Sequence, residues 1–193
     1  MVRAAPDHAT CYAAWAELLR YPGRGEDPAL SEHVGLILEQ APERGVDLLP
    51  LLEYLEDNGP SALEEVFTRT FDANAERALE VGWHLYGENY ARGAFMVRMR
   101  DLLRRLDVTE NAELPDHISH VLLVLARADT GTARAIASGV LSPALAKILE
   151  GFGDQGNPYH GVMRGLKRFV DDAHSTPSEE AAPAGGAPSE LER

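Results

Sequence analysis

Apolar side chains recur along this chain at intervals of three and four residues, the spacing that places them on one face of an α-helix. In the first such run, Tyr12, Trp15 and Leu18 follow Asp7, a residue type that commonly caps a helix N-terminus. The chain lacks a convincing run of alternating apolar and polar residues, the pattern typical of a β-strand. The sequence therefore predicts an all-α protein.

Turn and capping residues divide this periodicity into separate helices. Ser61 and Glu64 have the spacing of a capping box and predict a helix start, and Pro115 has the place of a proline in the first turn of a helix. Two helices near the middle of the chain are expected over residues 78–86 and 90–106. Together these signals predict a single-domain bundle of about eight helices.

The composition changes near the C-terminus, where residues 174–193 are mostly Ser, Pro, Glu, Ala and Gly. Such a segment buries too little apolar surface to offset the entropy of ordering it. The length of 193 residues suits one domain. We therefore expect a helical domain over residues 1–173 and a disordered tail over residues 174–193.

The chain is acidic, with 31 Asp and Glu residues against 18 Lys and Arg residues and a formal net charge of −13. This balance argues against binding to nucleic acid or to an anionic membrane surface, because both select basic proteins. A basic partner would be attracted electrostatically. The same charge would also keep the protein soluble without any partner, and the composition leaves both interpretations open.

Cys11 is the only cysteine, so neither an intramolecular disulfide nor a cysteine-based zinc site can form. The chain begins without the apolar stretch of a secretory signal, and its longest apolar run, residues 121–126, is too short to span a bilayer. These features predict a cytoplasmic protein.

Two stretches carry polar residues within apolar surroundings, namely WHLYGENYARG and ELPDHISH. An enzymatic hypothesis would place a metal ion on His84, Glu88, His117 and His120, because residues four apart share a helix face. The Glu-x-x-His pattern of di-iron bundles is absent from the sequence, however. The residues alone favour a simpler interpretation of ELPDHISH, a helix N-terminus at which an acidic side chain complements the unpaired N–H groups.

Two longer blocks identify a relationship. The first block, residues 71–103, is FDANAERALEVGWHLYGENYARGAFMVRMRDLL, and the second block, which begins at residue 113, is ELPDHISHVLLVLAR. Both closely resemble the NarJ family, the delta subunits of respiratory nitrate reductase and related molybdoenzymes, within the TorD-like chaperone superfamily. The early segment CYAAWAELLRYPG is similar to the first helix of that family. The resemblance extends over residues 10–170.

The resemblance implies an all-α chaperone that binds the N-terminal segment of a molybdoenzyme catalytic subunit until the molybdenum cofactor is inserted. It implies no catalysis and no resident cofactor, and it leaves open a monomer or a dimer. A permanent structural subunit of a respiratory complex is an alternative role. The candidate binding residues that match the family motifs are His84, Tyr86, Gly87, Glu88, Tyr90, Arg92, Gly93, Glu113, Leu114, Pro115, Asp116, His117 and His120.

These residues suggest how a bound segment would be recognised. Basic residues of the partner would meet Glu88, Glu113 or Asp116, while apolar anchors would supply most of the affinity. A neutral His117 would accept a hydrogen bond from the peptide. Its protonation near a pKa of about 6.5 would then weaken the binding of a basic segment.

Overall fold

The computed structural model describes residues 7–23, 28–153 and 156–174. Within these ranges every named element is a helix, which confirms the predicted all-α fold. Neighbouring elements run into one another, so the described residues form nine continuous helical stretches, against about eight predicted. The predicted tail beyond His174 lies outside the described residues.

The α-helices are α1 (His8–Leu18), α2 (Pro28–Gln40), α3 (Pro42–Gly45), α4 (Leu49–Asn58), α5 (Pro60–Phe67), α6 (Val81–Tyr86), α7 (Tyr90–Arg105), α8 (Ile118–Arg127), α9 (Thr130–Ile136), α10 (Ser142–Glu150) and α11 (Pro158–His174). A 3₁₀ turn, η1 (Val46–Leu48), joins α3 to α4, and two π-helical turns, η2 (Thr68–Asp72) and η3 (Ala137–Leu141), continue α5 and α9. No helix in the described ranges combines the length and apolar character needed to cross a bilayer.

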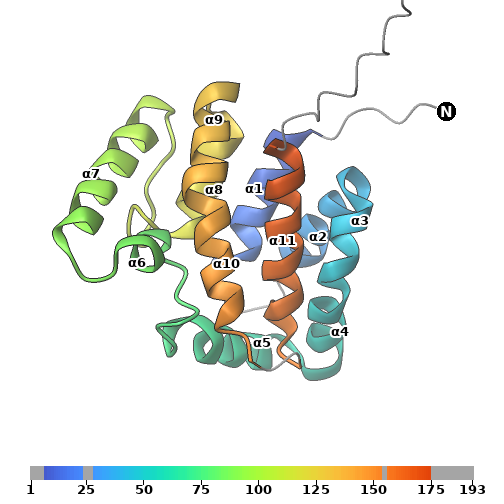
Figure 1. Ribbon diagram of the computed structural model, residues 1–193. Helices are drawn as coiled ribbons and strands as arrows, with labels where there is room; N and C mark the ends of the chain where they lie inside the picture. Colours follow the sequence, from blue (N-terminus) through green and yellow to red (C-terminus); the bar gives the residue numbers. More distant parts are fainter. Residues whose placement is uncertain (1–6, 24–27, 154–155, 175–193) are drawn as a thin grey trace, which may run out of the picture.

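The core lies where α1, α8, α10 and α11 meet. Helix α1 packs on α8 and α2, and α11 packs on α10 and on the segment from α3 to α4. Asp7 caps α1 by accepting hydrogen bonds from the N–H groups of Ala9 and Thr10, as the sequence predicted. Figure 1 shows α6 and α7 on one side of this core and α2, α3 and α4 on the other.

Helix α11 approaches the segment from α3 to η1 closely. A methyl group at Gly161 would lie 2.1 Å from the backbone oxygen of Asp47, so only glycine fits there. The Asp47 carboxylate is buried and accepts hydrogen bonds from Arg164, at 2.8 Å, and from Arg168, at 3.0 Å. Both arginines lie on α11, and these contacts fix it against the N-terminal half of the chain.

The capping box predicted before α5 is wrong, although the helix starts close to the predicted place, at Pro60. Gly59 precedes α5 without any side-chain cap, so Ser61 and Glu64 do not form a capping box. Glu64 instead accepts a hydrogen bond from the Tyr21 hydroxyl at 3.1 Å.

The two helices that adjoin the sequence blocks also begin later than predicted. Helix α6 starts at Val81 rather than residue 78, and α8 starts at Ile118 rather than at Pro115. The residues before each helix are not helical because they pair with one another across the fold, in the contact described next.

Candidate functional site

A short antiparallel pairing joins the two blocks. The Val81 N–H donates to the Asp116 carbonyl oxygen at 2.9 Å, and the Ile118 N–H donates to the Leu79 carbonyl oxygen at 2.8 Å. Glu80 and His117 face each other in the bridge between these bonds. Segments distant in the sequence therefore meet at one place, immediately before α6 and α8.

Asp116 anchors this junction from inside the protein. Its side chain is fully buried and accepts a hydrogen bond from Arg92 Nε at 2.9 Å. The Arg92 guanidinium also lies 5.8 Å from the centre of the Trp83 ring. A methyl group at Gly82 would lie 2.5 Å from the Asp116 carboxylate, so glycine is needed for this approach. Asp116 therefore already has a basic partner within the protein, and its side chain is closed off from solvent.

His120 supports the loop before α8 and is also buried. Its Nε2 accepts a hydrogen bond from the Asn111 N–H at 3.3 Å, which leaves Nδ1 to donate to the Leu114 carbonyl oxygen at 2.9 Å. Pro115 is buried beside it. These residues lie inside the protein, where they shape the loop. They support the site from behind and do not form part of its open surface.

His117 caps α8, with Nδ1 accepting a hydrogen bond from the Ser119 N–H at 3.2 Å. The neutral ring therefore carries its proton on Nε2. Burial lowers the pKa of His117 to about 4, and the charges of His120 and Arg20 act in the same direction. The expectation of a titration near 6.5 is thus wrong, because the imidazole is held neutral inside the protein.

The pKa of His117 gives a prediction for acid stability. Between about pH 6.5 and pH 4 the unfolded chain gains a proton at His117 that the folded protein excludes, so stability falls as the pH falls. The loss from this residue amounts to about 3 kcal/mol. A His117→Asn variant keeps a capping side chain but does not titrate. Chemical denaturation across this pH range should show a smaller loss in the variant, and equal losses would contradict the assignment.

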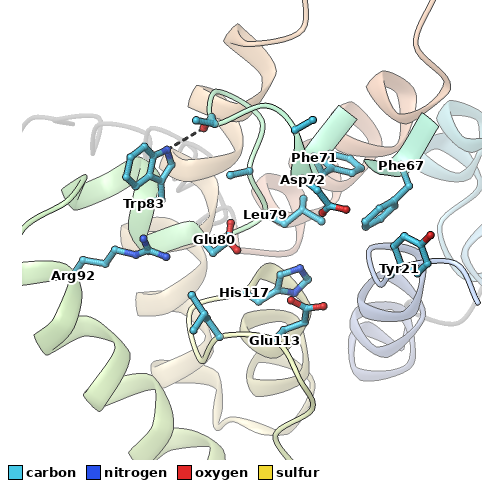
Figure 2. A pocket seen from close by; sticks show the side chains of 14 residues that line it. Tyr21, Phe67, Phe71, Asp72, Leu79, Glu80, Trp83, Arg92, Glu113 and His117 are labelled. Carbon is cyan, nitrogen blue, oxygen red and sulfur yellow. Dashed lines mark hydrogen bonds between the residues drawn. The ribbon is translucent and has the colours of Figure 1, made fainter. Parts of the chain in front are cut away.

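A cavity of about 660 Å³ opens at the junction, and we call it the central cavity. Figure 2 shows Glu80 in its middle, with Trp83 and Arg92 on one side and Tyr21 and Phe67 on the other. The cavity is lined by Tyr21, Phe67, Phe71, Asp72, Ala73, Ala75, Ala78, Leu79, Glu80, Trp83, Arg92, Glu113, Leu114 and His117. It thus combines acidic side chains with an aromatic wall, which is formed by Tyr21, Phe67 and Phe71.

The aromatic wall is fixed by the core behind it. The Phe67 ring centre lies 5.0 Å from that of Phe71 and 5.6 Å from that of Tyr21. The rings of both phenylalanines also contact Tyr159 on α11 edge to face. Trp83, opposite them, donates its indole N–H to the Ala75 carbonyl oxygen at 2.9 Å. Rigid aromatic surfaces of this kind bind apolar side chains at little entropic cost.

Burial raises the pKa of Glu80, and the nearby charges of Asp116 and Glu113 raise it further. The N–H of Glu80 itself and the charge of Arg92 oppose the rise. The side chain therefore sits where negative charge is already in excess. Asp72 and Glu113 contribute two more carboxyl groups to the same cavity.

A smaller hollow of about 460 Å³ adjoins the central cavity through two shared residues, Tyr21 and Ala73. It lies against α5 and η2, and its other lining residues are Ser61, Glu64, Glu65, Thr68 and Arg69. The two hollows therefore meet at Tyr21 and Ala73.

Four of the residues predicted from the sequence line the central cavity: Arg92, Glu113, Leu114 and His117. The prediction missed the aromatic wall, Asp72, Glu80 and Trp83. Three of the missed residues lie in the first block, within the stretch FDANAERALEVGW: Asp72, Glu80 and Trp83. The family resemblance of that stretch was the signal by which they could have been found.

The other residues predicted in the first block lie outside the cavity lining. His84 Nε2 contacts the Ala78 carbonyl oxygen at 2.7 Å, and burial lowers its pKa. Tyr86 packs against the buried Phe95, with ring centres 5.5 Å apart. Glu88 is exposed, and Tyr90 is 92% exposed. The two glycines lie at the end of α6 and in the first turn of α7: Gly87 and Gly93.

The side chains of the metal hypothesis are held by other contacts. His120 uses both ring nitrogens within the loop, and His84 is engaged by the backbone at residue 78. Across the described part of the chain, no three His, Cys, Asp or Glu side chains gather in a way that could hold a metal ion. The side chains His84, Glu88, His117 and His120 do not form one site.

The chain also matches a known protein family. A family model described as nitrate reductase delta subunit matches residues 39–163, which is more than half of the chain. The matched region contains both blocks and every residue lining the central cavity except Tyr21. Among curated proteins, no significant match is found.

Proposed function

Because the chain belongs to the nitrate reductase delta subunit family, we propose that it is a cytoplasmic assembly chaperone that binds the N-terminal segment of a molybdoenzyme catalytic subunit. The enzyme would be nitrate reductase or a relative, and the chaperone would hold this client segment until the molybdenum cofactor is inserted. It would act by binding alone, with no catalytic residue and no cofactor of its own. The observation that carries the proposal is the central cavity at the junction of the two blocks.

The size and lining of the cavity suit a few side chains of an extended or helical segment. Cavities of about 300–1,000 Å³ accommodate ligands of that size rather than folded domains. A client segment with one apolar face would place anchors on the aromatic wall, each contributing roughly 1.5–3 kcal/mol when fully buried. Its polar face would lie towards the carboxylates of Asp72 and Glu113, whose exposed ion pairs contribute about 0–1 kcal/mol each. Apolar contacts would thus supply most of the affinity.

Leu114 gives a direct test because it lines the cavity and is 47% exposed, so its replacement disturbs the fold little. A Leu114→Gln variant should bind a synthetic client peptide about tenfold more weakly, since it loses one apolar contact. Isothermal titration would measure the change. Leu36 on α2 is 38% exposed and lies outside the cavity, so Leu36→Gln is the matched control and should bind like the wild type.

If Leu114→Gln bound the peptide as tightly as the wild type while Leu36→Gln bound it more weakly, the binding surface would lie elsewhere.

The purified mature enzyme offers a second test of the role. A chaperone should be absent from it, whereas a stoichiometric copy of this chain would indicate a permanent structural subunit.

A further inference from the structure

We propose that Glu80 receives the positively charged head of one arginine or lysine of the client segment and so decides which segment is bound. This inference rests on the proposed function and specifies the chemistry of the same cavity. It starts from an imbalance of charge among the lining residues.

The central cavity contains more negative than positive charge. Its lining includes the carboxyl groups of Asp72, Glu80 and Glu113 and only one cationic side chain, Arg92. Arg92 is already paired with the buried Asp116, at 2.9 Å. None of the three lining carboxylates forms an ion pair with another described residue. A cationic guest would therefore complement the cavity, whereas an acidic one would be repelled.

Glu80 is distinguished from the other two acids by its position. Its backbone is held on both sides by the pairing of Leu79 with Ile118 and of Val81 with Asp116. Asp72 is exposed, whereas Glu80 and Glu113 are half-buried, and Figure 2 shows Glu80 in the middle of the cavity. A fixed and partly desolvated carboxylate binds a cation more strongly than a mobile surface one. Burial is the main cause of the raised pKa of Glu80, and the charge of Arg92 only partly opposes it.

The surroundings of Glu80 fit the rest of a basic side chain. Tyr21, Phe67 and Leu79 offer apolar surface to an aliphatic stem, while the head reaches the carboxylate. On the other side of the cavity, the Arg92 guanidinium lies over the Trp83 ring, 5.8 Å from its centre. A guanidinium can donate two parallel hydrogen bonds to one carboxylate, which favours arginine over lysine.

The test combines a protein variant with a peptide series. The peptides carry the N-terminal sequence of the molybdoenzyme catalytic subunit from the same genome. Each basic residue is replaced in turn by a neutral analogue, citrulline for arginine and acetyl-lysine for lysine. For the wild type, one replacement should weaken binding about tenfold, as expected for a charged hydrogen bond in a partly buried site. For Glu80→Gln, the parent peptide should bind more weakly, and that same replacement should have almost no further effect.

Glu56→Gln is the matched control, because Glu56 is an exposed glutamate on α4 and lies outside the cavity. It should respond to the peptide series as the wild type does. Circular dichroism would show that Glu80→Gln remains folded. If the wild type binds the peptides and Glu80→Gln shows the full sensitivity to every replacement, the role of Glu80 is disproved while the chaperone function stands. If the wild type binds none of the peptides, both fail.

Discussion

Replacing Arg92 by methionine should lower the free energy of unfolding by about 3–5 kcal/mol at neutral pH, because it leaves the Asp116 carboxylate buried without its partner. Methionine keeps most of the apolar stem of the side chain, so the loss reports mainly on the charge. A second substitution, Asp116→Asn, removes the buried charge and should restore more than half of the lost stability. Urea denaturation of the two single variants and the double variant measures this coupling.

Arg98 provides the control for the Arg92 variant. It lies exposed on the same helix, α7, and Arg98→Met should change stability by no more than about 0.5 kcal/mol. If Arg92→Met were as mild as Arg98→Met, the pair between α7 and the second block would not hold the junction together, and the geometry of the central cavity would need another cause.

The second large effect is expected at Gly161, where α11 meets the backbone of residue 47. An added methyl group would lie 2.1 Å from the Asp47 carbonyl oxygen, and neither helix backbone can yield without separating the two segments. The separation would also strain the hydrogen bonds from Arg164 and Arg168 to the Asp47 carboxylate. Gly161→Ala should therefore cost about 3 kcal/mol and lower the melting temperature by roughly 10 °C.

Gly35 is the matched control for this substitution. It lies within α2, and a methyl group there would meet nothing within 4 Å. Gly35→Ala should therefore raise stability by up to about 1 kcal/mol, because alanine is the better helix former. Thermal unfolding of both variants distinguishes close packing from helix propensity. A neutral Gly161→Ala would contradict the close approach of α11.

The helical fold was predictable because its signals are local. The periodicity of the apolar residues indicated the helices, and Asp7 marked the start of the first one correctly. The boundaries at residues 78 and 115 were wrong because the residues before α6 and α8 pair with each other. That pairing depends on how the chain folds back, and no local pattern of side chains encodes it.

The site was only partly predictable for the same reason. The two blocks indicated the right region, but a sequence does not show which polar residues turn inward. Asp116 and His120 proved to be internal supports, whereas Glu80, which carried no recognised motif role, lies in the middle of the cavity. Phe67 and Phe71 have the helical spacing of ordinary core residues, so their exposure to a cavity could not be inferred.

The central claim is that the client segment binds in the central cavity, and the two tryptophans of the chain provide a direct test. Trp83 lines the cavity, whereas Trp15 is fully buried in the core on α1. In an NMR titration with client peptide, observed through the two indole N–H resonances, the Trp83 signal should shift until saturation while the Trp15 signal stays in place. A Trp83→Phe variant assigns the two signals. Saturable binding that leaves the Trp83 signal unchanged would contradict the account.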